Sequence, residues 1–160
     1  MRKNFIKDII ELADLDPRIV LLTLDVGYPT FDPFIKKYPG RYLNVGISEQ
    51  NAVSFATGMA IAGKIPFLYS INSFLLFRAF EQIRFLSHMG QHVVLVGSGL
   101  GKEYTNYGLS HYSEEDIDIL KTLPIKVLTP EDKEDLAKKI LEAYKHEGAS
   151  YIRLSKKNFN

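Results

Sequence analysis

The chain contains no cysteine, no long apolar run and almost no net charge. Without cysteine, disulfides, thiolate metal sites and a cysteine nucleophile are all excluded. No apolar run approaches the ~20 residues of a membrane-spanning helix, and the charges within residues 1–8 interrupt the apolar core that a signal peptide needs. Lys and Arg number 20 against 19 Asp and Glu, a balance that disfavours a broad nucleic-acid-binding face. We therefore expect a cytoplasmic protein with no membrane and no nucleic-acid partner.

Apolar runs alternate with amphipathic stretches along the whole sequence. This alternation is typical of the α/β class with a parallel sheet. The 160 residues show no internal repeat and no linker, which predicts one domain spanning residues 1–160. Strands are expected at residues 19–24, 42–45, 66–70, 93–96, 126–128 and 151–154. Helices are expected at residues 3–15, 30–37, 48–62, 72–88, 117–121 and 130–145.

Glu49 follows a short apolar run and stands in the first turn of the helix expected at residues 48–62, with Ser48 as its cap. An acid at this position complements the helix dipole, which contributes about 0.3–1 kcal/mol. The alternative is that the strand delivers a catalytic carboxylate to the edge of the sheet. Composition alone leaves both interpretations open.

The helix behind Glu49 favours the second interpretation. Ala52, Ala56 and Ala60 recur every four residues, and Gly58 lies between them. A glycine inside a helix costs about 1 kcal/mol relative to alanine, which indicates the close approach of another backbone, such as that of a second subunit. At such a crowded junction, burial raises the pKa of a carboxyl group.

Aromatic side chains recur every third residue at Phe74, Phe77 and Phe80. Such a stripe usually belongs to the core of a protein. Here Phe74 and Phe77 fall in the first turns of a helix that follows a strand, at the same sheet edge as Glu49. An acid beside flat aromatic rings suits a heteroaromatic ligand with a basic nitrogen.

Two further features follow strand ends. Residues 97–101 are glycine-rich, but no helix is expected directly behind them, so the sequence does not match a dinucleotide-binding fingerprint. His111 lies in the long polar loop that follows, and loops of this length are often functional. Asp25 directly follows the first strand. Asp25, Glu49, the Phe74 and Phe77 pair, and His111 are thus expected at one edge, where open α/β sheets bind ligands.

These segments together resemble the pyrimidine-binding domain of the thiamine diphosphate enzymes of the transketolase group. Residues 45–63 are similar to the motif around the glutamate of the group, in the version found in deoxyxylulose-phosphate synthases. Residues 73–77 resemble the transketolase segment that packs on the aminopyrimidine ring. Residues 108–111 are similar to the Gly-x-Thr-His segment of transketolases. Residues 151–155 are similar to the end of the domain. The resemblance implies a three-layer α/β/α sandwich with a mostly parallel sheet of about six strands.

The resemblance also implies a role for each site residue. Glu49 hydrogen-bonds N1′ of the cofactor aminopyrimidine and thereby activates it, and His111 contacts the sugar as donor or proton shuttle. Phe74 and Phe77 pack against the pyrimidine ring. Val26 is the apolar contact that keeps the cofactor in its bent conformation. The residues implied to contact thiamine diphosphate are Asp25, Val26, Glu49, Phe74, Phe77 and Phe80.

The family segment that holds the diphosphate and the divalent metal has no counterpart in this sequence. The resemblance therefore implies no metal ligand in this chain, and a separate chain that holds the diphosphate with Mg²⁺ or Ca²⁺. We expect either the subunit of a split transketolase or a domain of a longer one, inactive alone in both cases. As a subunit it would self-associate through the Glu49 helix in a dimer or heterotetramer. Its reaction would be two-carbon ketol transfer between sugars or sugar phosphates. Decarboxylating carboligation and a non-catalytic assembly or regulatory role remain alternatives. Arg78, Arg84 and Arg153 receive no role.

Overall fold

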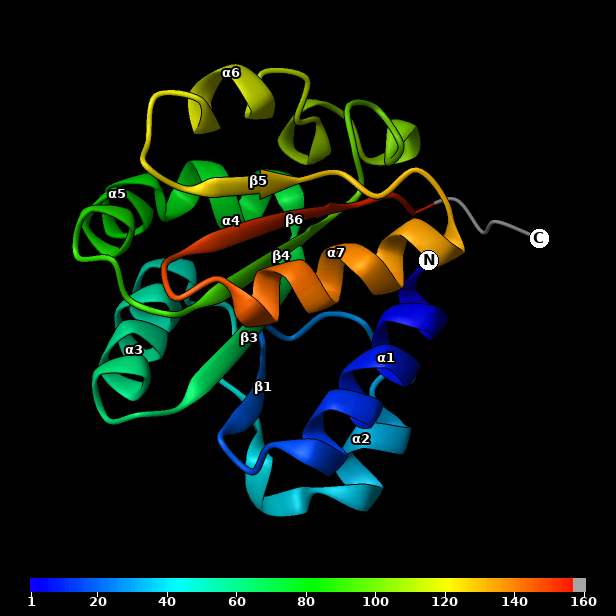
Figure 1. Cartoon of the computed structure of the whole chain (residues 1–160). Helices are drawn as coiled ribbons and strands as arrows, with labels where there is room; N and C mark the ends of the chain where they lie inside the picture. Colours follow the sequence, from blue (N-terminus) through cyan, green and yellow to red (C-terminus); the bar gives the residue numbers. More distant parts are fainter. Residues whose placement is uncertain (157–160) are drawn as a thin grey trace.

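The computed structural model describes residues 1–156. Within these residues, six parallel strands form one sheet in the order β2-β1-β3-β4-β6-β5 (Figure 1). The strands are β1 (Ile19–Thr23), β2 (Tyr42–Asn44), β3 (Ile65–Ile71), β4 (Val94–Ser98), β5 (Lys126–Leu128) and β6 (Ser150–Leu154). The expected α/β class and the six-stranded parallel sheet are confirmed.

Helices cover both faces of the sheet and complete a three-layer α/β/α sandwich (Figure 1). The helices α1 (Arg2–Leu15), α2 (Asp32–Lys37) and α7 (Lys133–Lys145) pack on one face. The helices α3 (Glu49–Ile61), α4 (Asn72–Arg78), α5 (Phe80–His88) and α6 (Asp116–Leu120) pack on the other. Short 3₁₀ turns η1 (Pro39–Arg41), η2 (Thr105–Tyr107) and η3 (Leu109–His111) lie in the connections. None of the helices within residues 1–156 is long and apolar enough to cross a membrane.

The strands are apolar on both sides because each side of the sheet has its own core. In β4, Val94 and Val96 face α1 and α7, whereas Leu95 faces α3 to α5. Successive side chains of a strand point to opposite faces, so a doubly covered strand has to be apolar throughout. This is why the strands read as continuous apolar runs.

The helix expected at residues 72–88 is two helices, which corrects the sequence-based prediction. Ala79 separates α4 from α5 with φ −113° and ψ 21°. The break lets α4 pack against β3, β4 and η3 while α5 packs against α3. Neither proline nor glycine occurs at this position, so the break follows from tertiary packing and not from local propensity.

Two predicted helix starts also differ from the structure. Ser48 occupies the N-cap position of α3 as expected, but its hydroxyl donates to the Val45 carbonyl oxygen at 2.8 Å and makes no capping hydrogen bond. The last charged helix begins at Lys133, because the carboxylate of Asp132 caps it by accepting the Asp135 N–H at 2.8 Å. The expected start at residue 130 is therefore wrong by three residues.

Candidate active site at the carboxyl edge of the sheet

The candidate site lies where the strand order reverses. The connection from β1 leads outward to β2, and the next one leads back to β3 on the opposite side of β1. Segments that follow neighbouring strands therefore diverge at the carboxyl edge and leave room for a ligand. Glu49 follows β2, Phe74 follows β3, and His111 lies in the long segment after β4.

Glu49 is the first residue of α3, and its side chain is buried against α4. Only 6% of the residue is exposed, and its Oε1 accepts a hydrogen bond from Nη1 of Arg78 at 2.7 Å. Arg78 is the last residue of α4. Arg78 is the one partner of this carboxylate among the described residues, which leaves Oε2 free to accept another donor.

The turn that delivers Glu49 is built by Asn44 at the end of β2. The side-chain oxygen of Asn44 accepts the backbone N–H of Gly46 and of Asp25, both at 3.0 Å. Its amide group donates to the Asp25 carboxylate at 3.1 Å. Gly46 has φ +73°, a conformation that favours glycine. Asn44 thus couples the ends of β1 and β2 and fixes the start of α3.

Arg78 also contacts the aromatic side of the site. Its guanidinium carbon lies 3.8 Å from the centroid of the Phe74 ring. The Phe74 and His111 ring centroids are 4.6 Å apart, edge to face. The Ser73 hydroxyl donates to the Ser110 carbonyl oxygen at 2.9 Å and ties this loop to α4. Glu49, Arg78, Phe74 and His111 therefore form a continuous row of contacts.

A cavity of about 510 Å³ opens beside this row. It is lined by Ile47, Ser48, Glu49, Gln50, Asn51 and Arg78. A cavity of this size with a buried acid fits a heteroaromatic ring that offers a basic nitrogen. A hollow of about 530 Å³ lies between α1 and the segment after β1, but Lys7 there is paired with Glu11 and the lining is mainly apolar. Of these two hollows, the one lined by Glu49 is therefore the better candidate for the active site.

Comparison with known proteins identifies the family. The model of the transketolase pyrimidine-binding domain matches residues 1–160. The chain belongs to the transketolase pyrimidine-binding domain family. Membership in this family implies thiamine diphosphate as the cofactor. A buried carboxylate with a free oxygen, beside a cavity and an aromatic ring, fits the pyrimidine part of that cofactor.

Relatives of this pyrimidine-binding chain include separate subunits as well as longer enzymes. The chain is 33% identical to the 6-deoxy-6-sulfo-D-fructose transketolase subunit of Clostridium sp. (strain MSTE9), over 96% of this chain and 49% of that protein. It is 34% identical to the 1-deoxy-D-xylulose-5-phosphate synthase of Methylacidiphilum infernorum, over 93% of this chain and 24% of that protein. The chain thus spans half or less of the length of these relatives.

A solved structure described as a split gene transketolase, inactive β4 tetramer, superposes with a TM-score of 0.89. It is 33% identical in sequence, and the match covers 99% of this chain and 52% of that one. Fold and sequence therefore lead to the same family.

The remaining residues predicted for this pyrimidine-binding site lie outside the row of contacts. Asp25 is exposed with φ +54° and joins the site through Asn44. Val26 packs on the core beneath α1 and α2, and Phe80 on the core beneath α3 and α5. The Phe77 residue is 41% exposed. Their predicted contacts with the cofactor stay predictions.

Sequence reasoning missed two members of the site. Arg78 is four residues after Phe74, a spacing that places both side chains on one face of a helix, so this signal was present. Tyr107 stacks on His111 with ring centroids 4.8 Å apart and planes 30° apart. It is the last residue of the short turn η2, in a long connection that lacks the regular spacing of a helix or strand, so the sequence did not indicate this contact.

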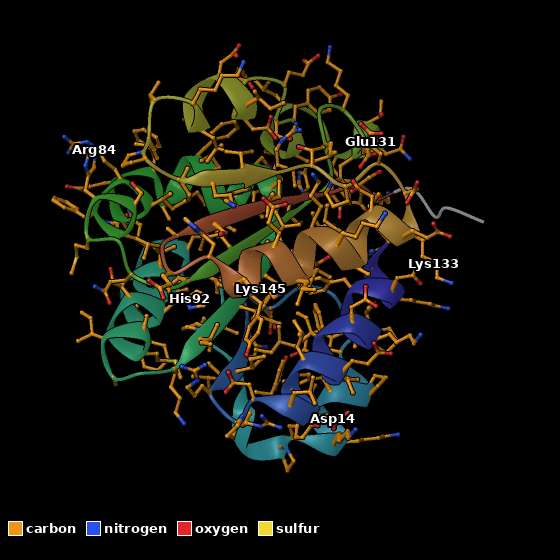
Figure 2. The ribbon with its side chains drawn as sticks, in the orientation of Figure 1. Asp14, Arg84, His92, Glu131, Lys133 and Lys145 are labelled. Atoms are coloured by element: carbon orange, nitrogen blue, oxygen red, sulfur yellow. The ribbon has the colours of Figure 1, made fainter. Side chains whose placement is uncertain are left out.

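The other two arginines do not reach the site. Arg153 is buried, and its guanidinium donates to both oxygens of Asp116, at 2.9 and 2.8 Å. Arg84 points away from α5 into solvent (Figure 2). Within the described part of the chain, no three His, Asp or Glu side chains are grouped so as to hold a metal ion.

Proposed function

We propose that this chain is the pyrimidine-binding subunit of a thiamine diphosphate-dependent transketolase that moves a two-carbon ketol unit between sugars or sugar phosphates. The observation that carries the proposal is the buried carboxylate of Glu49, with one free oxygen, in contact through Arg78 with Phe74 and His111. Relatives named as transketolase subunits support the same reaction.

The chain's own residues would bind and orient the cofactor. Thiamine diphosphate supplies, when bound, the electron sink that allows carbon–carbon bonds to break and form. Glu49 would hydrogen-bond N1′ of the aminopyrimidine through the carboxylate oxygen that Arg78 leaves free. Phe74 and Phe77 exclude water from the ring, and His111 donates a hydrogen bond to an oxygen of the sugar.

We infer that a second chain holds the diphosphate and its Mg²⁺ or Ca²⁺. The related structure whose description calls it an inactive β4 tetramer supports the inference that a chain of this type is inactive alone. Apolar side chains exposed on α3 support self-association through that helix, since Phe55 is 42% exposed and Ile61 63%. Apart from the α3 backbone and the two neighbouring residues, no described residue would lie within 4 Å of a methyl group at Gly58, so the close approach expected there does not come from the described part of this chain.

The decisive experiment combines this chain with a diphosphate-binding transketolase chain, thiamine diphosphate and Mg²⁺. We expect ketol transfer by the mixture and none by this chain alone. Glu49→Gln keeps the size of the side chain but removes its acid–base capacity, and we expect a rate at least about 100-fold lower. Full activity of the Glu49→Gln complex would contradict the role of the acid.

Decarboxylating carboligation is a second candidate, favoured by the similarity to 1-deoxy-D-xylulose-5-phosphate synthase. The same mixture separates the two reactions when it is given pyruvate and an aldose. Release of CO₂ coupled to formation of a longer ketose would assign the second reaction. A complex that assembles but supports neither reaction would assign a non-catalytic role.

A further inference from the structure

Tyr107 forms the outer end of the row of contacts that begins at Glu49. Its ring stacks on one side of His111, at 4.8 Å, and Phe74 contacts His111 at 4.6 Å. The order along the row is Glu49, Arg78, Phe74, His111 and Tyr107. Tyr107 is thus separated from the acid by the histidine.

Within the loop the Tyr107 side chain makes ring contacts, stacked on His111 and edge to face with Tyr104 at 6.1 Å between centroids. The residue is 63% exposed, and its hydroxyl makes no hydrogen bond to any described residue. Other groups also hold the loop: the Tyr107 backbone N–H donates to the Tyr104 carbonyl oxygen at 2.9 Å, and the Tyr104 ring fills the space above Gly99. An exposed aromatic ring with an available face, beside a site, is suited to bind a ligand.

The position of the ring defines what it can contact. If Glu49 holds the cofactor and His111 contacts the oxygen at the reacting carbon, the rest of the sugar chain extends past His111. The C–H groups of a sugar form a weakly polar face, and an aromatic ring binds such a face while the hydroxyl groups stay in water. Tyr107 offers this surface next to His111, on which its ring stacks.

We propose that Tyr107 is a specificity-determining residue that packs against the distal carbons of the acceptor sugar. The proposal rests on the proposed function and deepens it, because it assigns the acceptor to the class of aldoses long enough to extend past His111. A two-carbon acceptor reacts at His111 but does not reach the Tyr107 ring.

The test compares acceptors of different length in the assembled enzyme. Hydroxypyruvate serves as donor, and glycolaldehyde, D-ribose and D-ribose 5-phosphate serve as acceptors. For Tyr107→Ala we expect the KM for both five-carbon acceptors to rise about fivefold or more, and the KM for glycolaldehyde to rise by a clearly smaller factor. Tyr107→Phe retains the ring and should match the wild type.

Three outcomes would overturn the inference: an unchanged KM for the five-carbon acceptors, an equal loss with glycolaldehyde, or a Tyr107→Phe variant as impaired as Tyr107→Ala. A purely structural role would affect all acceptors alike. Calorimetric titration of D-ribose 5-phosphate into the assembled complex makes the comparison without turnover. Equal affinities of wild type and Tyr107→Ala would overturn the inference even if the complex transfers no ketol unit, an inactivity that would count against the proposed function alone.

Discussion

At the scale of single residues, the ion pair with Arg78 gives the buried Glu49 carboxylate a hydrogen-bond donor in the free chain. Glu49 is almost fully covered, and the Arg78 side chain is 44% exposed. A buried carboxylate without a partner has lost its hydrogen bonds to water and gains none from the protein, which lowers the stability of the fold. The guanidinium also covers the Phe74 ring, where cation–π contact adds to the ion pair.

Replacing Arg78 should therefore destabilise the chain. For Arg78→Leu we expect the free energy of unfolding to fall by about 1 kcal/mol, because Glu49 stays buried and loses its hydrogen bond. Urea unfolding at neutral pH measures the change. Arg84→Leu is the matched control on the exposed side of α5, with an expected change within about 0.5 kcal/mol. Equal stability of the two variants would show that the ion pair contributes nothing.

Asp8 provides a test of pH dependence. Burial in the contact between α1 and α7 raises the pKa of Asp8 to about 6, with repulsion from Glu11 adding to the effect and Lys7 and Lys133 opposing it. Its Oδ2 is buried without a hydrogen bond within the described chain. Because the unfolded chain ionises first as pH rises, the wild type should lose stability from about pH 4 to about pH 6.

Asp8→Asn should remove that loss. We expect a higher melting temperature than the wild type at pH 7–8 and no difference below about pH 4. Asp14→Asn on the same helix is the control with the opposite sign, because hydrogen bonds from Lys37 and Tyr38 lower the pKa of Asp14. Asp14 lies near α2 (Figure 2). A melting-temperature difference for Asp8→Asn that does not vary with pH would contradict the assignment.

At the scale of elements, a buried polar network fixes the start of α4, from which Phe74 extends. Asp116 at the start of α6 accepts from Arg153 of β6 and from the Asn72 side chain. The Tyr151 hydroxyl donates to the oxygen of Asn72 at 2.7 Å. Gly97 of β4 has no room for a Cβ, which would overlap Asn72 and Tyr151. The first glycine of the glycine-rich segment, residues 97–101, is therefore required by packing within β4.

Removing one member of this network should lower the free energy of unfolding. Arg153→Met leaves the Asp116 carboxylate buried without its cation, and we expect the free energy of unfolding to fall by about 3 kcal/mol or more. Chemical denaturation measures it. The matched surface pair is Lys126 with Glu142, joined at 2.9 Å, and Lys126→Met should cost at most about 1 kcal/mol. Similar losses in both variants would exclude a special role for the buried pair.

At the scale of the whole molecule, exposed apolar side chains concentrate on α3 and α5. Ile61 is 63% exposed, Phe85 on α5 is 55% exposed, and Met89, the residue directly after α5, is 50% exposed. The two helices pack side by side and cover the same face of the sheet (Figure 1). Such a surface is typical of an interface between subunits.

A charge introduced on this face should reduce self-association. For Ile61→Asp we expect a smaller mass in solution than for the wild type, because a buried carboxylate at an apolar interface is unfavourable. Sedimentation velocity measures it. Leu15→Asp is the control, since Leu15 is 83% exposed on the opposite face of the sheet. A wild-type monomer, or an equal effect of both substitutions, would contradict the proposed interface.

Most of the fold was predictable because its determinants are local. The runs at residues 19–24 and 93–96 are apolar throughout, as strands covered on both faces must be. The break at Ala79 was not predictable, since two helices part there to follow different packing partners. For the site, strand ends placed Glu49, Phe74 and His111 at one edge, because all parallel strands end on the same side.

The sequence by itself determined the α/β class, the family and the position of Glu49 at the start of a helix, because hydrophobic periodicity and motifs are properties of neighbouring residues. Only the tertiary structure decided which groups touch that acid. Arg78 is 29 positions from Glu49, and Tyr107 reaches His111 through the path of an irregular loop. Such contacts depend on how α3, α4 and the loop after β4 pack together, which no local pattern records.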